Sequence, residues 1–227
     1  MSFRFHYILL IALSIGLFSC NNKEKKTEDN AGIDTSASSI QNTGPAKNIL
    51  FFGTSLTAGY GLDPGEAYPE LIQQQLDSLK LPYKAINGGL SGETSAAGKA
   101  RIDWLLKQPL SVFVLELGAN DGLRGIPVKE TTANLQAIIE KVRAKYPEAK
   151  LMLTGMEVPP NMGDKYASDF RNMFKSLASN NKMTFLPFLL EGVAGIPKLN
   201  QQDGIHPTAQ GQKILAKNVW QKLQPLL

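Results

Sequence analysis

The sequence predicts an α/β fold in three layers, with helices on both faces of a five-stranded parallel sheet. Short apolar runs alternate with longer stretches of helical periodicity, which is the pattern of β-α-β units. The run 111–117 is apolar except for Glu116, as in a strand buried on both faces. Turn-forming residues follow the ends of these runs. Because crossovers between parallel strands are right-handed, few strand orders remain, and five strands suit the flavodoxin-like order 2-1-3-4-5.

Residues 1–20 are typical of an export signal. Arg4 supplies a positive charge, and the apolar run 7–18 is shorter than the roughly 20 residues that a spanning helix needs. The run ends in Leu17-Phe18-Ser19-Cys20, which resembles a bacterial lipobox, in which Cys20 becomes the lipidated first residue. An ordinary cleaved signal with a chance cysteine is the alternative.

Residues 21–46 are rich in Asn, Ser, Thr, Lys and Glu, a composition that cannot bury enough surface to fold. We expect a flexible tether here and one globular domain over residues 47–227. The protein is thus expected to be an exported bacterial lipoprotein, anchored to a membrane on its periplasmic or cell-surface side.

Composition excludes several classes of function. The chain is 43% hydrophobic and 19% charged, as in an ordinary globular protein. Its net charge of +4 is spread along the sequence without a basic stripe, which argues against a nucleic-acid partner. One cysteine and two histidines allow no intrachain disulfide and no Cys/His zinc cluster. We expect neither a metal nor a cofactor, and the oligomeric state stays open.

The first predicted strand, 48–52, runs into a tight turn containing Gly53-Thr54-Ser55. A serine in such a turn can present an exposed hydroxyl, although Thr57 breaks the G-x-S-x-G pattern of the α/β-hydrolase elbow. Taken alone, the turn is most often an ordinary one.

The remaining elements are then expected in this order: helix 68–80 with proline in its first turn, strand 83–87, loop 88–92, helix 94–107, strand 111–117, loop 118–122, amphipathic helix 129–145, strand 150–154, helix 165–180, strand 184–186, a small helix and helix 208–223.

The candidate site residues all follow strand ends. Ligands of such sheets bind outside the carboxyl ends of the strands. The loops after strands one to five contain, in turn, Ser55, Gly92, Asn120, Val158-Pro159, and Asp203 with His206. Since strand one lies between strands two and three in the predicted order, Ser55 is flanked by the loops of Gly92 and Asn120.

These residues suit acyl transfer. A serine becomes a nucleophile when a base takes its proton, and His206 is the only histidine after the signal. Asp203 can orient its imidazole. Candidate oxyanion donors are the N–H groups of Ser55 and Gly92 and the amide of Asn120. A structural histidine, a flexible glycine turn and an Asx-turn are the alternatives.

Other polar and apolar residues near these loops have expected roles. Asp121 is expected to be structural and to bond its own loop. Glu116 is expected to make a strand-end hydrogen bond and Glu157 to be a solvated loop carboxylate, and support of the site residues is the alternative for both. Apolar residues in loops at a sheet edge have no core to enter. We therefore expect an acyl groove lined by Leu123, Ile126, Val158 and Pro159, unless these side chains cap neighbouring helices.

Four blocks in order resemble the SGNH (GDSL) hydrolases, and most closely the bacterial thioesterase I / lysophospholipase L1 / arylesterase branch. They are FGTSLT (52–57), NGGLSGETS (87–95), ELGANDGLRG (116–125) and DGIHP (203–207), and the resemblance extends over residues 47–227. The resemblance implies a nucleophile Ser55, a triad completed by Asp203 and His206, and an oxyanion hole of Ser55, Gly92 and Asn120. Thr54, where the family has aspartate, lies outside this set.

The resemblance implies a serine esterase that cleaves carboxylic ester or thioester bonds through an acyl-enzyme. Acyl, aryl or lysophospholipid-type esters are the expected substrates, and membrane contact is expected through the lipid anchor. A carbohydrate O-deacetylase on the same scaffold and a catalytically silent binding lipoprotein are the alternatives. The complete Ser/Gly/Asn/His/Asp set argues against silence.

Overall fold

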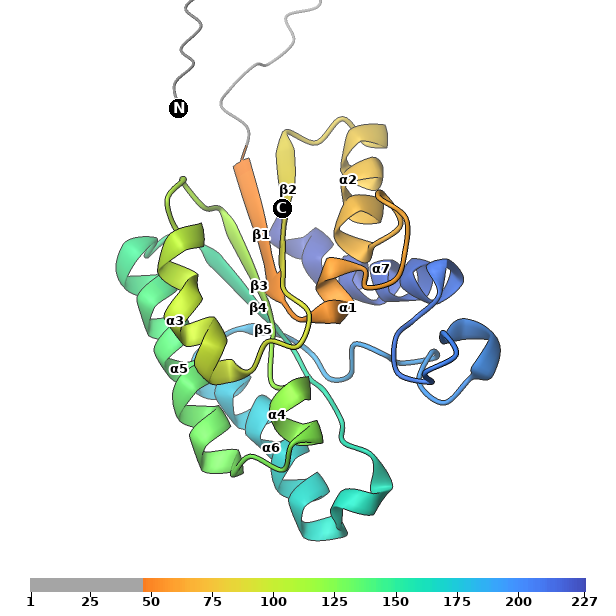
Figure 1. The fold of residues 1–227 in the computed structure, drawn as a ribbon. Coiled ribbons are helices and arrows are strands. Elements are labelled where there is room, and N and C mark those ends of the chain that lie inside the picture. Colours follow the sequence, from red (N-terminus) through yellow and green to blue (C-terminus); the bar gives the residue numbers. More distant parts are fainter. Residues whose placement is uncertain (1–46) are drawn as a thin grey trace, which may run out of the picture. The chain divides into compact units, whose positions relative to one another are not determined.

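The computed structural model describes residues 47–227; the expected signal, Cys20 and the tether lie outside the described residues. Its five parallel strands have the order β2-β1-β3-β4-β5, which confirms the predicted fold class (Figure 1). The strands are β1 (Lys47–Gly53), β2 (Tyr83–Gly89), β3 (Val112–Glu116), β4 (Lys150–Thr154) and β5 (Thr184–Leu186).

Helices cover both faces of the sheet (Figure 1). Helices α2 (Tyr68–Ser78) and α7 (Ala209–Leu223) lie on one face, and α3 (Ser95–Leu105), α5 (Val128–Lys145) and α6 (Asp164–Asn180) lie on the other. Within residues 47–227, no helix combines the length and apolar character needed to cross a membrane. Shorter helical segments are α1 (Ser55–Ala58), α4 (Ala119–Leu123) and the 3-10 turns η1 (Pro160–Met162), η2 (Pro197–Leu199) and η3 (Gln224–Leu226).

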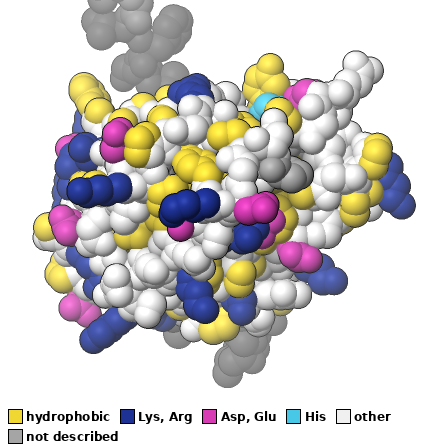
Figure 2. All heavy atoms as spheres, turned by 90° about the horizontal axis from the view of Figure 1, so that it is seen from below, with side chains coloured by type: hydrophobic (Ala, Val, Ile, Leu, Met, Phe, Trp, Pro, Cys, Tyr) yellow, Lys and Arg dark blue, Asp and Glu magenta, His cyan; other side chains and the backbone are white. Residues whose placement is uncertain are grey.

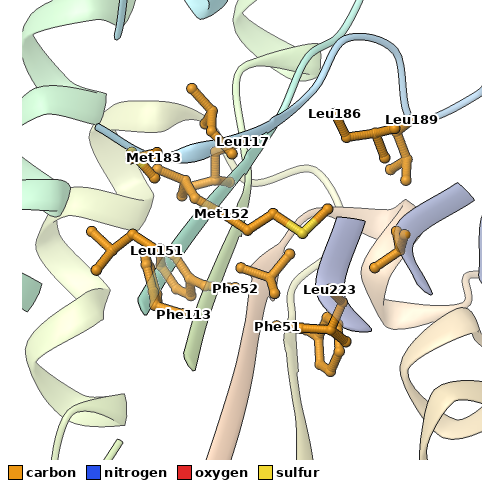
Figure 3. Packing of buried hydrophobic residues seen from close by; sticks show 14 of the residues in the cluster. Phe51, Phe52, Phe113, Leu117, Leu151, Met152, Met183, Leu186, Leu189 and Leu223 are labelled. Atoms are coloured by element: carbon orange, nitrogen blue, oxygen red, sulfur yellow. The ribbon is translucent and has the colours of Figure 1, made fainter. Parts of the chain in front are cut away.

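Strand β1 joins the two halves of the core, because its consecutive side chains point to opposite faces. Phe51 meets the Tyr68 ring of α2 edge to face at 5.6 Å, and it lies beside Leu223 of α7 (Figure 3). Phe52 stacks on Phe113 of β3 at 6.1 Å on the other face. Each such buried ring stabilises the fold by about 1.5–3 kcal/mol, so β1 is held firmly where its carboxyl end begins the site.

Two segments expected as loops are short helices, α1 and α4, and β2 continues over Gly88 and Gly89. Gly89 pairs with Gly53 at the ends of β2 and β1. A Cβ atom on Gly89 would collide with the backbone of Ala58 and Thr57. The glycine therefore lets α1 pack directly on the end of the neighbouring strand.

Candidate active site

Ser55 lies on a tight turn at the carboxyl end of β1. Thr54 is the N-cap of α1, and its hydroxyl accepts the N–H of Leu56 at 3.4 Å. Ser55 is the first helical residue, and its carbonyl accepts the N–H of Gly59, which has a left-handed φ of 72°. Glycine adopts this conformation without a Cβ clash, so the turn closes within one helical turn of the serine.

A hydrogen-bonded chain joins Ser55 to a loop 151 residues later. His206 Nε2 lies 2.9 Å from Ser55 Oγ, and His206 Nδ1 lies 2.7 Å from Asp203 Oδ2. The other oxygen of Asp203 accepts the backbone N–H groups of Ile205 at 2.9 Å and His206 at 3.0 Å. The bonds from the His206 backbone and ring, and from Ile205, lower the pKa of Asp203 to about 2. Asp203 is therefore ionised throughout the neutral range.

The imidazole of His206 is supported by a residue that the sequence did not indicate. The Tyr60 ring packs at a tilt against it, with 4.6 Å between the ring centroids. Gln201 donates its backbone N–H to the His206 carbonyl at 2.7 Å and its side-chain amide to the Tyr60 carbonyl at 2.7 Å. The loop of the histidine is thus bound to the loop that follows the serine.

The three candidate oxyanion donors come from adjacent strand ends. Gly92 has a left-handed φ of 77° in the loop after β2, and Leu90 of this loop donates its N–H to the Gly53 carbonyl at 2.9 Å. The amide of Asn120, on α4, donates to the Glu93 carbonyl at 3.1 Å. Within residues 47–227, the backbone N–H groups of Ser55 and Gly92 donate to no protein acceptor. Both groups are therefore free to bind an anionic oxygen.

An arginine fixes the loop of Gly92. Arg101 of α3 donates to both carboxylate oxygens of Glu93 at 2.6 Å and to the Gly88 carbonyl at 2.8 Å. Its guanidinium lies 4.6 Å from the centre of the Phe52 ring. Since the Glu93 side chain is 1% exposed, this two-pronged ion pair anchors the loop to the body of the protein.

The expectation that Asp121 bonds its own loop is wrong. Asp121 is fully buried and accepts the N–H of Ser95 at 2.8 Å, the hydroxyl of Ser95 at 2.5 Å and the hydroxyl of Thr131 at 3.3 Å. The helical turn α4 directs the carboxylate inward, where α3 and α5 supply the donors. Glu116 makes the expected strand-end bond, accepting the Thr54 N–H at 2.8 Å, and Glu157 is exposed as expected.

Ser55, Asn120 and His206 open into one pocket of about 720 Å³. Leu123, Val158 and Pro159 line it, as the sequence predicts, whereas Gly92 lies outside the lining. Figure 2 shows this face, where the cyan histidine adjoins hydrophobic side chains.

Ile126 does not line the pocket either. The chain turns away after α4, and the Ile126 carbonyl accepts the hydroxyl of Tyr166 at 2.7 Å. Apolar walls that the sequence did not indicate include Met156, Phe188, Leu190 and Ile205. Phe188 and Leu190 follow the carboxyl end of β5. Because ligands of such sheets bind outside the carboxyl ends of the strands, this position could have identified both residues as pocket walls.

Metal ligands are not gathered in this part of the chain. Among residues 47–227, no three His, Cys, Asp or Glu side chains cluster closely enough to hold an ion. Elsewhere in the site, the Ser55 hydroxyl lies beside the His206 imidazole with N–H donors nearby, an arrangement suited to nucleophilic attack.

Known proteins are similar to this chain in sequence and in structure. The GDSL-like lipase/acylhydrolase family matches residues 51–214. Esterase TesA of Pseudomonas aeruginosa is 39% identical over 183 residues, which cover 80% of this chain and 90% of TesA. The thioesterase 1/protease 1/lysophospholipase L1 of Escherichia coli K12 is 37% identical over 183 residues, which cover 80% of this chain and 86% of that protein. The crystal structure of TesA superposes with a TM-score of 0.75 over 80% of this chain and 100% of TesA.

Proposed function

The chain belongs to the GDSL-like lipase/acylhydrolase family, and from this premise we propose that Ser55, His206 and Asp203 are the catalytic triad of this ester hydrolase. The observation that carries the proposal is the continuous chain of hydrogen bonds from Ser55 Oγ through both nitrogens of His206 to Asp203. A hydroxyl is a weak nucleophile until a base accepts its proton, and His206 Nε2 is placed to do so.

The proposed reaction has two halves. Ser55 Oγ attacks the ester carbonyl while its proton passes to His206, and the protonated His206 then donates that proton to the leaving alcohol or thiol. Water next attacks the acyl-enzyme, with His206 accepting its proton and returning it to Ser55 Oγ as the acid departs. Asp203 keeps one imidazole tautomer and stabilises the imidazolium; hydrogen bonds from His206 and Ile205 hold the pKa of Asp203 near 2, so the aspartate stays ionised.

The tetrahedral intermediates carry an oxyanion, for which we assign the N–H groups of Ser55 and Gly92 and the amide of Asn120. The free state of both N–H groups supports this assignment, because unpaired donors need no reorganisation before they bind the developing charge. Acyl, aryl or lysophospholipid-type esters are the proposed substrates. The relatives named esterase, arylesterase and lysophospholipase support this range, as do the apolar walls of the pocket.

The test combines activity with covalent labelling. Hydrolysis of p-nitrophenyl butyrate is compared in wild type, in Ser55→Ala and in Ser78→Ala, a matched control on exposed surface at the end of α2. We expect activity and labelling by a fluorophosphonate to be lost only in Ser55→Ala, with the adduct mapped to Ser55 in wild type. Full activity of Ser55→Ala would exclude the mechanism.

We also propose that the protein is exported and anchored to a membrane through acyl chains on Cys20. The support is sequence alone: an apolar run ending in Leu17-Phe18-Ser19-Cys20, followed by a polar stretch before the domain. Mass spectrometry of the full chain expressed in a bacterium should find the mature protein beginning at an acylated Cys20. A mature N-terminus elsewhere, without lipid, would favour an ordinary cleaved signal.

A further inference from the structure

A carboxylate that the proposed mechanism does not use lies beneath the nucleophile. Glu116 is the last residue of β3, opposite Gly53 in the pairing of β1 with β3, and it is fully buried. A Cβ atom on Gly53 would collide with the Glu116 carboxylate and with the Thr57 hydroxyl. The side chain therefore fills the space directly under the turn that carries Ser55.

Within residues 47–227, every hydrogen bond that the Glu116 carboxylate accepts comes from the Ser55 turn. Thr54 donates its N–H to Oε2 at 2.8 Å, and its hydroxyl lies 3.0 and 3.1 Å from the two oxygens. Thr57 donates its hydroxyl to Oε2 at 2.8 Å. Thr54 precedes Ser55, and Thr57 lies two residues after it, so one carboxylate binds both sides of the nucleophile.

We propose that Glu116 is a positioning residue for Ser55: as a carboxylate it fixes the turn through Thr54 and Thr57, and as a neutral acid it releases part of that turn. The proposal rests on the assignment of Ser55 as nucleophile. The Ser55 turn sets both the direction of Oγ toward His206 and the direction of the Ser55 N–H. Loosening the turn therefore weakens attack and oxyanion binding together.

The two protonation states differ because all the partners of the carboxylate are donors. The ionised form accepts three protons without conflict. A neutral acid must instead donate its own proton to a threonine hydroxyl, either Thr57 Oγ1 at 2.8 Å or Thr54 Oγ1 at 3.0 Å. If Thr57 accepts the proton, its own hydroxyl can donate to the hydroxyl of Tyr68, which lies 2.8 Å away. Protonation thus reverses one of the bonds to the threonine hydroxyls and weakens the charge-assisted bond from the Thr54 N–H.

The surroundings bring this change into the neutral range. Burial raises the pKa of Glu116 to about 7, although the bonds from Thr54 and Thr57 lower it. The titratable group facing it is Tyr68 of α2, whose own pKa is raised well above its usual value by burial and by the charge of Glu116. Glu70 lies beyond Tyr68 on the same helix. Among residues 47–227, no lysine, arginine or histidine contacts Glu116.

Basic side chains on the surrounding elements have other partners. Arg101 of α3 is paired with Glu93 and lies over the ring of Phe52. His206, before α7, lies beyond Ser55 and faces Asp203. Gln212 of α7 is neutral and bridges the Tyr68 N–H and the Leu56 carbonyl. In the part of the chain that the structure describes, no counter-charge is paired with Glu116 to hold it permanently ionised.

The test is the pH dependence of the kcat of wild type divided by the kcat of Glu116→Gln. Glu116→Gln keeps the size of the side chain, has no charge and can donate to Thr57, so it imitates the neutral acid. The values of kcat for wild type and Glu116→Gln are measured from pH 5 to 9 on p-nitrophenyl butyrate. Both enzymes contain His206, so the ratio compares them at residue 116 alone. We expect the ratio to rise from about 1 near pH 5 to about 10 above pH 8, the size of one lost charge-assisted bond, with KM unchanged.

Controls separate this role from a merely structural one. Glu148→Gln, an exposed carboxylate before β4, should give a ratio of 1 at every pH. A ratio for Glu116→Gln that is constant with pH, or equal to 1 throughout, would overturn the proposal. Should Glu116→Gln fail to fold, Thr57→Val decides. This substitution removes a bond that lowers the pKa of Glu116. The decrease of kcat on the acidic side of the pH profile should therefore occur at higher pH than in wild type. An unchanged pH profile would count against the role of Glu116. Activity in Ser55→Ala would instead refute the proposed nucleophile.

Discussion

The side-chain amide of Asn120 donates a hydrogen bond of 3.1 Å to the backbone carbonyl of Glu93. A primary amide has two N–H groups, so one N–H holds the loop of Gly92 while the other is available to a substrate oxygen. The bond therefore joins Asn120 to the residue that follows Gly92, the other oxyanion donor proposed outside the nucleophile turn. A disturbance of either one displaces the other.

We predict that Asn120→Ala folds normally and loses about 10²–10³ in kcat, or roughly 2.7–4 kcal/mol, as for other oxyanion donors. Asn120 is half-buried, and the bond to Glu93 is the single side-chain hydrogen bond it makes within residues 47–227. Steady-state kinetics and the circular dichroism spectrum are measured together. An unfolded variant, or unchanged kcat, would instead favour a structural Asx-turn.

Arg101→Leu should destabilise the protein by about 3–5 kcal/mol, because the buried carboxylate of Glu93 would lose its ion-pair partner. Urea unfolding measures this loss. The double variant Arg101→Leu/Glu93→Leu removes both charges and should recover most of the stability. Both variants should lose kcat, since the loop of Gly92 no longer has its anchor. Equal stability of the single and double variants would show that the unpaired carboxylate of Glu93 is not what destabilises Arg101→Leu.

The stability of the wild type should fall as the pH rises from 4.5 to 7. Burial raises the pKa of Glu116 from 4.5 to about 7, so over this range the native state keeps a proton that the unfolded chain has lost. The contribution is fully present below pH 4.5 and is lost as the pH passes 7, at most about 3 kcal/mol. Urea unfolding at pH 5 and pH 8 should show this fall relative to Glu116→Gln. Parallel pH profiles of the two proteins would contradict the prediction.

The sheet was predictable because its central strands are continuous apolar runs with turn residues at their ends. The run 150–154 is a strand at the predicted bounds, and 111–117 contains β3. The same rule placed Ser55, Asn120 and His206 at one edge, where the structure brings them around one pocket.

What the sequence could not supply depends on short-range geometry. The helices α1 and α4 are too short for periodicity to appear, and α4 is what turns Asp121 inward and carries the chain away before Ile126. The tilted packing of Tyr60 against His206 accompanies the Gln201 bonds between two distant loops. No local pattern encodes such a contact.

The pocket should give a preference for acyl groups longer than acetyl. Its walls include Leu123 and Val158 after β3 and β4, and Phe188 and Leu190 after β5. Each methylene that an acyl chain buries against them contributes up to ~0.8 kcal/mol, or about fourfold in kcat/KM. The value should therefore rise from acetyl over several carbons and level off when the pocket is full. It is measured on p-nitrophenyl esters from acetyl to decanoyl.

Two truncated side chains, measured on the same series of esters, show which residues contact the acyl chain. Val158→Ala removes two methyl-group contacts inside the pocket, so it should flatten the rise for the longer esters and leave the acetyl ester nearly unaffected. Ile126→Ala is the matched comparison, because this side chain follows α4 but lies outside the lining, and it should keep the wild-type slope. The reverse result would restore Ile126 to the groove. A steady decline from acetyl onward, unaltered by Val158→Ala, would mean that the apolar walls do not bind the acyl chain, and a carbohydrate O-deacetylase would then explain the site better.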